Sequence, residues 1–330
     1  MLISETLKQL LGLLADGRFH SGTELASALG LSRSAIWKQL QALSELGVEL
    51  TAVSGKGYKL QQPLQLLENE QIFRFLSSRA VELLCSLEIH DVITSTNSYL
   101  LELASQGSES GKVCIAEYQS AGKGRRGRFW VSPFGQNIYL SVLWRYQDGP
   151  AALAGLSLAL GVAVVRALRT LGLTDVGLKW PNDIYWRQRK LAGILVEVSG
   201  ENGGPCHAVV GLGLNFYLSP QQAETIAQPW VDMRSALGAN AYMRRNELIA
   251  LLLNQLLPVI AEFRVDSIFQ FIEEWRSYDC MLGKTVDIFI GENRRSGVVS
   301  GIDEQGLLVL KTAEGRLQSF ASGDVSLSPA

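Results

Sequence analysis

The sequence predicts an α+β fold with three parts: an N-terminal winged helix-turn-helix, a central α/β domain built on a mixed or antiparallel sheet, and a small C-terminal β-barrel. The first 63 residues have the periodicity of three amphipathic helices followed by a hairpin. The central part contains many strand-like runs and few regularly spaced helices. From residue 278 onward, short strands alternate with tight turns. We therefore expect domains at residues 1–63, 64–277 and 278–330.

The N-terminal part follows the helix-turn-helix plan. Apolar residues recur at helical spacing over residues 1–15, and the Ser-Gly-Thr-Glu of residues 21–24 is a capping box that opens a second helix. After a turn at Gly30, Ser32 caps a third helix. Two strand-like runs at residues 48–60 flank a Ser-Gly-Lys-Gly turn. This pattern predicts a hairpin with a basic tip, the wing.

The third helix and the wing carry residue types that reach phosphates and base edges. Six Lys/Arg against five Asp/Glu give residues 1–63 a net charge of only +1, but the cations gather on these two elements. The alternative is a winged helix used for protein contacts. We favour DNA binding. The residues expected to contact DNA are Ser32, Arg33, Ser34, Trp37, Lys38 and Lys56.

The central part begins after a linker at residues 61–63. Helices are expected over residues 68–76, from the Thr-Ser-Thr-Asn of residues 94–97 to residue 105, over 151–171, and in the two segments 244–263 and 268–275. Residues 216–242 are predicted to be a loop region. Strands are expected at residues 81–84, 87–90, 113–117, 137–144, 176–179, 184–186, 193–198 and 208–214.

A glycine-rich basic stretch at residues 117–130 is the most distinctive segment of the chain. Three glycines alternate with four cations there. Glycine lets backbone N–H groups approach a ligand, and Lys or Arg supplies charge suited to phosphate or carboxylate. The alternative is a solvated basic loop without a ligand. We expect an anion-binding loop that is mobile until ligand phosphates supply partners for its cations.

Four common enzyme motifs do not fit this sequence. The Gly-x-Gly-x-x-Gly of residues 122–127 lacks the following helix of a dinucleotide site, because Pro133 and Gly135 stand where that helix should run. The Gly-Lys-Thr of residues 283–285 lacks the first glycine of a P-loop, since Tyr278 occupies that position. The three histidines are scattered, and neither a nucleophile elbow nor a metal-binding helix is present. Hydrolase and metalloenzyme functions are therefore disfavoured.

A second polar cluster, Lys-Trp-Pro-Asn-Asp, occupies residues 179–183. It could be a plain strand-turn-strand connection. A lysine, an amide and a carboxylate beside two tryptophans, Trp180 and Trp186, also suit a nucleotide and its metal ion. Lys190, at the start of the next strand, is a candidate cation for a carboxylate, and a solvated turn lysine is the alternative. Trp230 could anchor the loop or stack on a base.

The composition sets limits on the class of protein. A net charge of −2 gives no global attraction to nucleic acid, so DNA binding must come from a local patch. The four cysteines have neither metal-ligand nor redox spacing, which indicates reduced thiols in the cytoplasm. The N-terminus lacks the basic region of a signal peptide. The apolar run at residues 151–165 contains Ser157 and is too short to span a bilayer, so we expect a buried helix and no membrane.

Taken in order, these motifs resemble one family over essentially the whole chain. The helix-turn-helix, the Ser-Thr-Asn of residues 95–97, the basic loop, the Lys-Trp-Pro-Asn-Asp cluster and the Arg-Lys-x-x-Gly-Ile-Leu of residues 189–195 resemble the bifunctional biotin–protein ligases and biotin-operon repressors of bacteria (BirA type). The resemblance implies a biotin/lipoate ligase-like catalytic domain and an SH3-like C-terminal barrel. It also implies formation of biotinoyl-5′-AMP from biotin and ATP with Mg²⁺.

The resemblance further implies partners: a biotin carboxyl carrier protein of acetyl-CoA carboxylase, whose lysine takes the biotin, and operator DNA of biotin biosynthesis genes. The adenylate-bound protein is expected to be a homodimer that represses these genes, with the strand at residues 193–198 as a candidate pairing edge. Two alternatives stay open at this point. One is a winged-helix repressor that senses a metabolite without catalysis, and the other is a lipoate-type ligase.

Site residues follow from the resemblance, position by position. The loop departs from the usual Gly-Arg-Gly by having Lys123, which keeps the charge but loses the bidentate fork. Adenylate retention is therefore expected to differ. Biotin contacts are expected from Ser95, Thr96, Asn97, Gln119, Lys123, Gly124, Arg125 and Lys190. ATP contacts are expected from Arg125, Arg128, Asn182, Asp183, Asn215 and Trp230, with Asp183 also on the metal. Catalytic roles fall to Lys123, Arg125 and Lys190.

The expected chemistry explains which residue types are present. A biotin carboxylate that attacks an α-phosphate brings two anions together, and cations at that point screen the repulsion and stabilise the developing charge. A carboxylate is already a nucleophile, so the first step needs no general base. This accounts for the absence of a histidine constellation.

Overall fold

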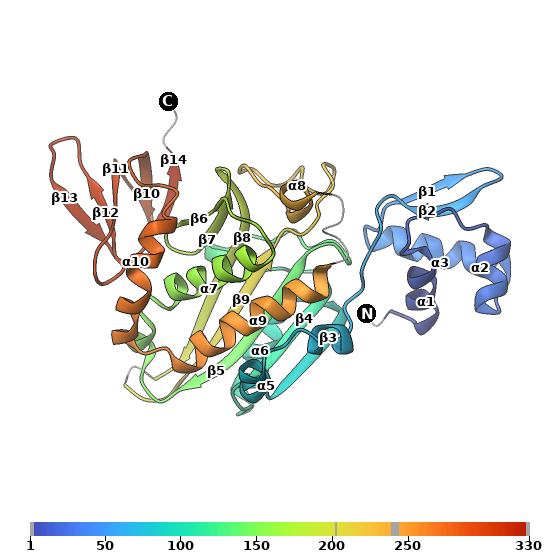
Figure 1. Cartoon of the computed structure of the whole chain (residues 1–330), viewed down its shortest axis with the longest axis horizontal. Helices are drawn as coiled ribbons and strands as arrows, with labels where there is room; N and C mark the ends of the chain where they lie inside the picture. Colours follow the sequence, from blue (N-terminus) through green and yellow to red (C-terminus); the bar gives the residue numbers. More distant parts are fainter. Residues whose placement is uncertain (1–2, 202, 239–243, 328–330) are drawn as a thin grey trace.

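The computed structural model describes residues 3–201, 203–238 and 244–327. Three parts follow one another along its longest axis: an N-terminal helical unit, a central sheet with helices, and a C-terminal sheet (Figure 1). The α+β prediction is confirmed.

The N-terminal unit is the predicted winged helix. Ser4, Ser21 and Ser32 cap its three helices, and the capping box of residues 21–24 is present. The two wing strands pair antiparallel, and His20 exchanges two backbone hydrogen bonds with Tyr58 at the base of the wing. The elements are α1 (Glu5–Leu14), α2 (Gly22–Leu29), α3 (Arg33–Glu45), β1 (Leu50–Val53) and β2 (Gly57–Leu60).

The central domain contains a seven-stranded mixed sheet in the order β3-β4-β5-β9-β8-β7-β6. Only β3 and β4 pair in parallel, and the other neighbours are antiparallel. The strands are β3 (Ser86–Ile93), β4 (Lys112–Gln119), β5 (Ile138–Tyr146), β6 (Val176–Lys179), β7 (Asp183–Trp186), β8 (Arg189–Gly200) and β9 (Cys206–Leu214).

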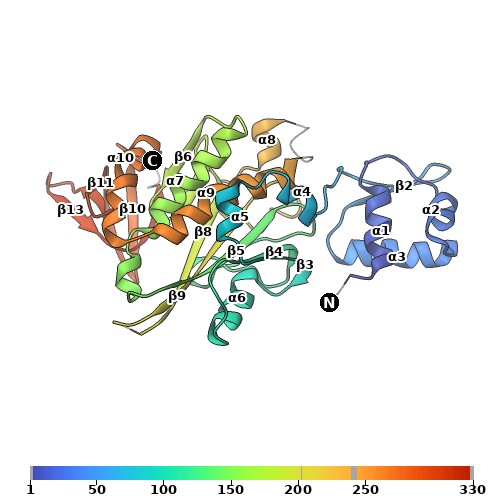
Figure 2. The same ribbon diagram turned by 60° about the horizontal axis from the view of Figure 1, so that its bottom comes forward.

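Helices cover both faces of this sheet. Helices α7 (Leu156–Thr170) and α9 (Arg245–Glu262) lie together on one face, and α6 (Thr96–Ser105) lies on the other (Figure 2). The alternation of β4 divides its side chains accordingly, since Val113 and Ile115 join the α7–α9 core whereas Cys114 joins the α6 core. The helical stretch Pro150–Thr170 is apolar enough to cross a membrane by composition, but 67% of its most apolar window is buried inside the protein. It is a core helix, as predicted.

One predicted strand is wrong. Residues 81–83 belong to helix α5 (Ser78–Leu83), and residue 84 is its C-cap. The helix begins where the Ser77 hydroxyl accepts a hydrogen bond from Ala80 N. A short apolar run does not distinguish strand from helix by periodicity alone, and the cap decides it here. The predicted loop region 216–242 also contains a short helix, and its residues 239–242 lie outside the described part. The remaining central helices are α4 (Asn69–Phe73), α8 (Met233–Leu237) and α10 (Phe269–Tyr278).

The C-terminal unit is a five-stranded antiparallel sheet in the order β13-β12-β11-β10-β14. The sequence predicts four of these strands, at residues 285–290, 294–302, 307–310 and 317–321, but not the last strand, β14. The apolar side chains of this sheet belong to the same buried cluster as α7 and α9, and Trp180 Nε1 donates to Gly306 O at 3.0 Å. This unit is therefore packed onto the central domain. The strands are β10 (Thr285–Ile290), β11 (Asn293–Ile302), β12 (Leu308–Lys311), β13 (Leu317–Phe320) and β14 (Asp324–Leu327).

The winged helix has its own core, but that core extends onto the central domain. Phe134, which follows the basic loop in the chain, is 2% exposed and packs within the winged-helix cluster. An ion pair joins Lys8 Nζ to Asp91 Oδ2 at 2.8 Å, and Gln222 Nε2 donates to Gly47 O at 3.0 Å. The winged helix is thus in contact with the segment that follows the basic loop.

Candidate active site

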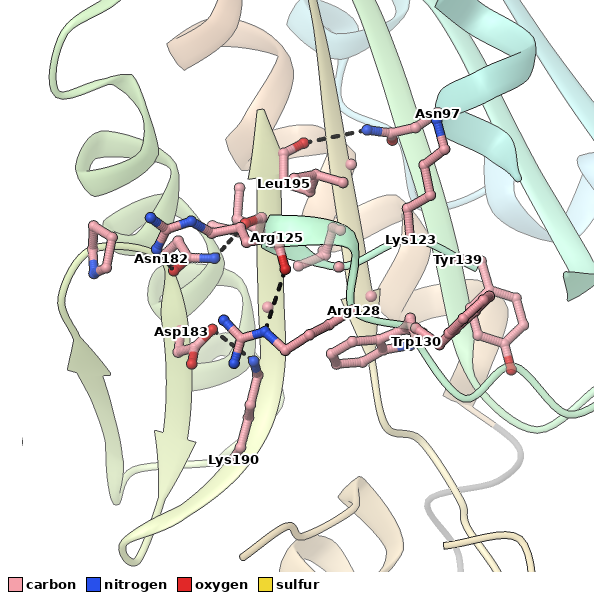
Figure 3. A pocket seen from close by; sticks show the side chains of 18 of the residues that line it. Asn97, Lys123, Arg125, Arg128, Trp130, Tyr139, Asn182, Asp183, Lys190 and Leu195 are labelled. Carbon is pink, nitrogen blue, oxygen red and sulfur yellow. Dashed lines mark hydrogen bonds and ion pairs between the residues drawn. The ribbon is translucent and has the colours of Figure 1, made fainter. Parts of the chain in front are cut away.

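A cavity opens where the basic loop, the polar cluster of residues 179–183 and the strands β8 and β9 meet (Figure 3). Strand β14 of the C-terminal sheet closes one side of it through Asp324, Val325 and Ser326. Most residues predicted to bind biotin or ATP line this cavity, although they come from four separate segments of the chain. These are Ser95, Thr96, Asn97, Gln119, Lys123, Gly124, Arg125, Arg128, Asn182, Asp183 and Lys190.

A network of buried polar side chains forms the floor. The Gln119 carbonyl oxygen accepts from Thr96 N at 2.9 Å, while its amide donates to Ser132 Oγ at 3.1 Å. Ser141 Oγ lies 2.7 Å from Thr96 Oγ1 and 2.6 Å from Asn97 Oδ1. Such a network fixes the orientation of each amide, so donors and acceptors are already placed for a polar ring.

Two polar residues that contact this network, Ser141 and Glu197, were not predicted from the sequence. Ser141 lies in the middle of β5 in an otherwise apolar run, and a lone serine of this kind was the available signal. Glu197 lies on β8, where its carboxylate accepts from Asn97 Nδ2 at 2.8 Å and lies 3.7 Å from Lys123 Nζ. Strand alternation shows which face a residue is on, but not which distant segment covers that face.

Two glycines of β9 shape the cavity wall. A Cβ at Gly211 would collide with the Asn97 amide, and one at Gly213 would lie 2.5 Å from the Trp130 ring. Both positions lack the space for any side chain without displacing these residues. The backbone of β9 therefore lets Asn97 and Trp130 approach the centre of the cavity.

Ion pairs connect the basic loop to the C-terminal sheet. Asp324 accepts from Arg128 Nη2 at 2.8 Å and lies 3.6 Å from both Arg125 Nη1 and Arg126 Nη1. Arg125 also donates to Asn182 Oδ1 at 2.9 Å (Figure 3). The expectation that the loop cations lack partners without ligand is therefore wrong. The carboxylate that pairs with them lies about two hundred residues away in the sequence, where no local pattern points to it.

Burial affects the charge state of the loop. Removal from water lowers the pKa of the Arg125 guanidinium, and the nearby Asp324 and Asp183 carboxylates oppose that shift. An arginine stays protonated under all ordinary conditions. Arg125 therefore presents a full positive charge in a partly dry site, where its attraction for an anion is strengthened.

Lys190 lies between a carboxylate and an aromatic ring. Its Nζ is 2.8 Å from Asp183 Oδ1, and both side chains are 14% exposed. The same ammonium lies 5.6 Å from the centre of the Trp130 ring. Lys190 is therefore oriented within the cavity, and the solvated-turn alternative does not describe it.

Two residues predicted to contact ATP lie in the segment that follows β9. Asn215 is buried, and its amide donates to Val231 O at 3.2 Å. Lys190 exchanges backbone hydrogen bonds with Pro229 and Val231 on either side of the half-buried Trp230. Neither Asn215 nor Trp230 lines the cavity in this structure. These hydrogen bonds hold the segment after β9 against the backbone of Lys190. Direct contact of Asn215 and Trp230 with ATP stays a prediction.

Three of the six predicted DNA-contacting residues line a second hollow, between the start of α2, the start of α3 and the wing. Arg33, Ser34 and Trp37 line it, and the Trp37 side chain is 55% exposed. Lys38 is exposed on the same helix. Ser32 is partly occupied as the helix cap, and Lys56 lies 5.9 Å from the Phe19 ring. An exposed Trp and basic residues at a helix start beside a wing are typical of groove and phosphate contacts.

Comparison with protein families gives three matches along the chain. Residues 89–215 match the biotin/lipoate A/B protein ligase family, residues 6–59 match an HTH domain, and residues 282–328 match the biotin protein ligase C-terminal domain.

Relatives and solved structures agree with these matches. The bifunctional ligase/repressor BirA of Escherichia coli (strain K12) is 42% identical over 322 residues, covering 98% of this chain and 97% of that protein. BirA of Bacillus subtilis is 30% identical and covers 95% of both chains. The structure of the biotin protein ligase from Aquifex aeolicus in complex with biotin and ATP has a TM-score of 0.62 at 27% identity, and covers 74% of this chain and all of that one.

Proposed function

The chain belongs to the BirA family of bifunctional biotin–protein ligases and repressors, and from that premise we propose how its residues serve both activities. As a ligase it uses biotin and ATP. One observation supports these roles most strongly. A single cavity has a floor of buried, oriented polar groups and, beside it, five cations: Lys123, Arg125, Arg128, Lys179 and Lys190. The floor suits a small polar ring, and the cations suit the anions that must meet beside it.

In the first half-reaction, a carboxylate oxygen of biotin attacks the α-phosphorus of ATP, and pyrophosphate leaves. Ser95, Thr96, Asn97 and Gln119 hold the biotin ring. Lys190 lies where the carboxylate meets the α-phosphate, and the loop of Lys123, Gly124 and Arg125 encloses that junction. Because both reactants are anions, these cations lower the barrier by reducing their repulsion.

In the second half-reaction, the amine of an acceptor lysine attacks the acyl carbon of biotinoyl-5′-AMP, and AMP leaves. The acceptor is a biotin carboxyl carrier protein, which follows from membership of the ligase family. Arg128, Asn182 and Asp183 hold the nucleotide side, with Trp230 covering the adenine and Asn215 supporting that segment. The protein is proposed to act in the cytoplasm, as expected from its unpaired cysteines.

Mg²⁺ is proposed to enter with the nucleotide. Within the part of the chain that the structure describes, no group of three or more His, Cys, Asp or Glu side chains could hold a metal ion. A single carboxylate beside substrate phosphates is nevertheless the usual protein contribution to a Mg²⁺ site. Asp183, with Asn182 beside it, fits that role, and the bound ion would supply charge neutralisation of the triphosphate.

As a repressor, the protein is proposed to bind operator DNA as an adenylate-loaded homodimer. Strand β7 pairs with β8 only up to Gly193, so the described residues from Val196 to Gly200 have β9 as their only strand partner. This exposed edge could pair with a second copy across a two-fold axis. Glu197 on this edge lies 3.7 Å from Lys123 of the basic loop, which supports a link between the ligand site and the dimer edge.

The proposed domain boundaries are residues 1–63, 64–277 and 278–330. The separate core of the winged helix supports the first boundary. The shared core of the central and C-terminal parts means that the second boundary divides two units that pack as one.

The test is sedimentation and operator binding with biotin alone, with ATP alone, and with both. We expect dimerisation and tight operator binding only with both, because a ligand shifts an equilibrium only through differential affinity for the two states. A single winged helix with net +1 neutralises few phosphates, so two copies are needed for strong binding.

A pair of matched variants locates the dimer edge. Val198→Lys places a charge on the exposed edge and should weaken the dimer and operator binding while leaving adenylate formation intact. Val265→Lys alters an exposed valine elsewhere and should change neither. Equal dimerisation in all three ligand conditions would contradict the coupling, and an unaffected Val198→Lys dimer would remove this edge from it.

A further inference from the structure

Lys179 is a cavity residue that the roles proposed above leave unused. It is the last residue of β6, and its side chain lines the cavity beside Asn182, Asp183 and Asp324. Its Nζ donates to the Tyr185 hydroxyl at 3.2 Å and lies 5.2 Å from the centre of the same ring. The nearest partner of this ammonium is therefore a neutral phenol.

The other four cations of the cavity each have a carboxylate within 4 Å. Lys123 has Glu197, Arg125 and Arg128 share Asp324, and Lys190 has Asp183. Among the residues that the structure describes, Lys179 has no such ion pair. Burial lowers the pKa of its ammonium, and the more distant Asp183 and Asp324 oppose that effect while Lys190 adds to it. A half-buried ammonium with no carboxylate within 4 Å among the described residues is poorly compensated, so this position is suited to receive an anion.

The position of Lys179 indicates which anion. Lys190 is proposed to lie at the junction of carboxylate and α-phosphate. Lys179 lies on the other side of strand β7 from it, on the strand whose Leu178 bridges Asp279 just before the C-terminal sheet. Arg125, which donates to Asn182, and Asp324 of β14 lie on that side as well. A nucleoside triphosphate that places its α-phosphate at Lys190 carries two more phosphates, and these need cations beyond that point.

We propose that Lys179 binds the β- and γ-phosphates of ATP and stabilises the leaving pyrophosphate. The inference rests on the proposed function of the cavity. In this step the bond from the biotin carboxylate oxygen to the α-phosphorus forms, and the bond from the α-phosphorus to the α,β-bridging oxygen breaks. The electron pair of the broken bond stays on pyrophosphate. Lys179 remains protonated throughout and donates hydrogen bonds to the oxygens that gain charge.

This role predicts that the two half-reactions respond differently to Lys179→Met, which keeps the unbranched apolar part of the side chain and removes its charge. Adenylate formation in a single turnover should slow by about 10- to 150-fold, the effect of losing a charge-assisted contact. Inhibition by added inorganic pyrophosphate should weaken in parallel. Transfer of biotin from chemically supplied biotinoyl-5′-AMP to the carrier protein should stay within about twofold, because no pyrophosphate is present in that step.

Two further variants control the experiment. Lys179→Arg keeps the charge and should recover part of the adenylation rate. Lys112→Met, on β4 and outside the cavity lining, should leave both half-reactions unchanged. The ligand-free Lys179→Met protein should be at least as stable to heat as the wild type, because the substitution removes a half-buried charge that has no carboxylate partner among the described residues.

The outcomes separate the inference from the function on which it rests. A wild-type protein that forms no adenylate would contradict the proposed function itself. Equal losses in adenylation and transfer, or adenylation by Lys179→Met at the wild-type rate, would overturn the role of Lys179 alone. If Lys179→Met does not fold, a Lys179→Gln protein with the wild-type adenylation rate and unchanged pyrophosphate inhibition would overturn it as well.

Discussion

Replacing Lys190 with alanine is expected to slow adenylate formation by about 10- to 150-fold, corresponding to about 1.5–3 kcal/mol for a lost charge-assisted contact. The Lys190 ammonium is held 2.8 Å from Asp183 and faces the Trp130 ring, so its charge is already in position when the two anions meet. The contact with Lys190 strengthens as charge develops at the α-phosphate in the transition state. Such a contact lowers the activation barrier and contributes less to the binding of the substrates in the ground state. Affinity for the biotin ring should therefore fall less than the adenylation rate.

The measurement is single-turnover adenylation beside calorimetric binding of biotin alone. Lys190→Arg keeps the charge and should retain more activity than Lys190→Ala, although its longer planar head cannot reproduce the contact with Asp183. Lys311→Ala changes an exposed lysine of β12 and should have no effect. An unchanged single-turnover rate in Lys190→Ala would remove this residue from the mechanism.

Replacing Arg245 with methionine is expected to destabilise the folded protein by about 3–5 kcal/mol. The Arg245 side chain is 1% exposed and pairs with Glu117, which is 3% exposed, at 2.6 Å. Its remaining donors reach Asn137 O and Gln65 O. The substitution leaves the Glu117 carboxylate buried without its counter-charge and the two carbonyls without donors. These groups connect β4, β5, α9 and the segment that follows the winged helix.

The free energy of unfolding in urea measures the loss. Arg79→Met removes one partner of the exposed pair between Arg79 and Glu262 and should leave the midpoint unchanged. The double replacement of Arg245 by methionine and Glu117 by leucine should recover much of the loss, because no charge is then left unpaired. A single Arg245→Met variant as stable as the wild type would show that the buried pair does not hold these elements together.

Local patterns in the sequence were sufficient for most of the fold. The serine caps of α2 and α3 and the alternation of β4 and β9 depend on neighbouring residues, so these elements could be predicted without knowing the tertiary structure. The α5 segment was misassigned because its run of apolar residues is too short for periodicity to separate helix from strand.

The site was predictable where its motifs are contiguous and not where it is assembled from distant segments. The Ser-Thr-Asn of residues 95–97 and the basic loop are recognisable in the sequence, and they do meet in the cavity. Asp324 was missed because it lies in a terminal strand of no special composition and contacts the loop only after the C-terminal sheet has packed. The sequence places Lys179 in the Lys-Trp-Pro-Asn-Asp cluster. That no described carboxylate pairs with it follows only from the assembled cavity.

The most direct test of the account is to mix the purified protein with biotin and ATP and to identify what it then holds. We predict stoichiometric release of pyrophosphate and a bound ligand with the mass of biotinoyl-5′-AMP, detected by mass spectrometry under native conditions. ATP alone and biotin alone should give neither. A protein that binds biotin and ATP together, releases no pyrophosphate and carries no adenylate would contradict the claim that this cavity joins the two substrates.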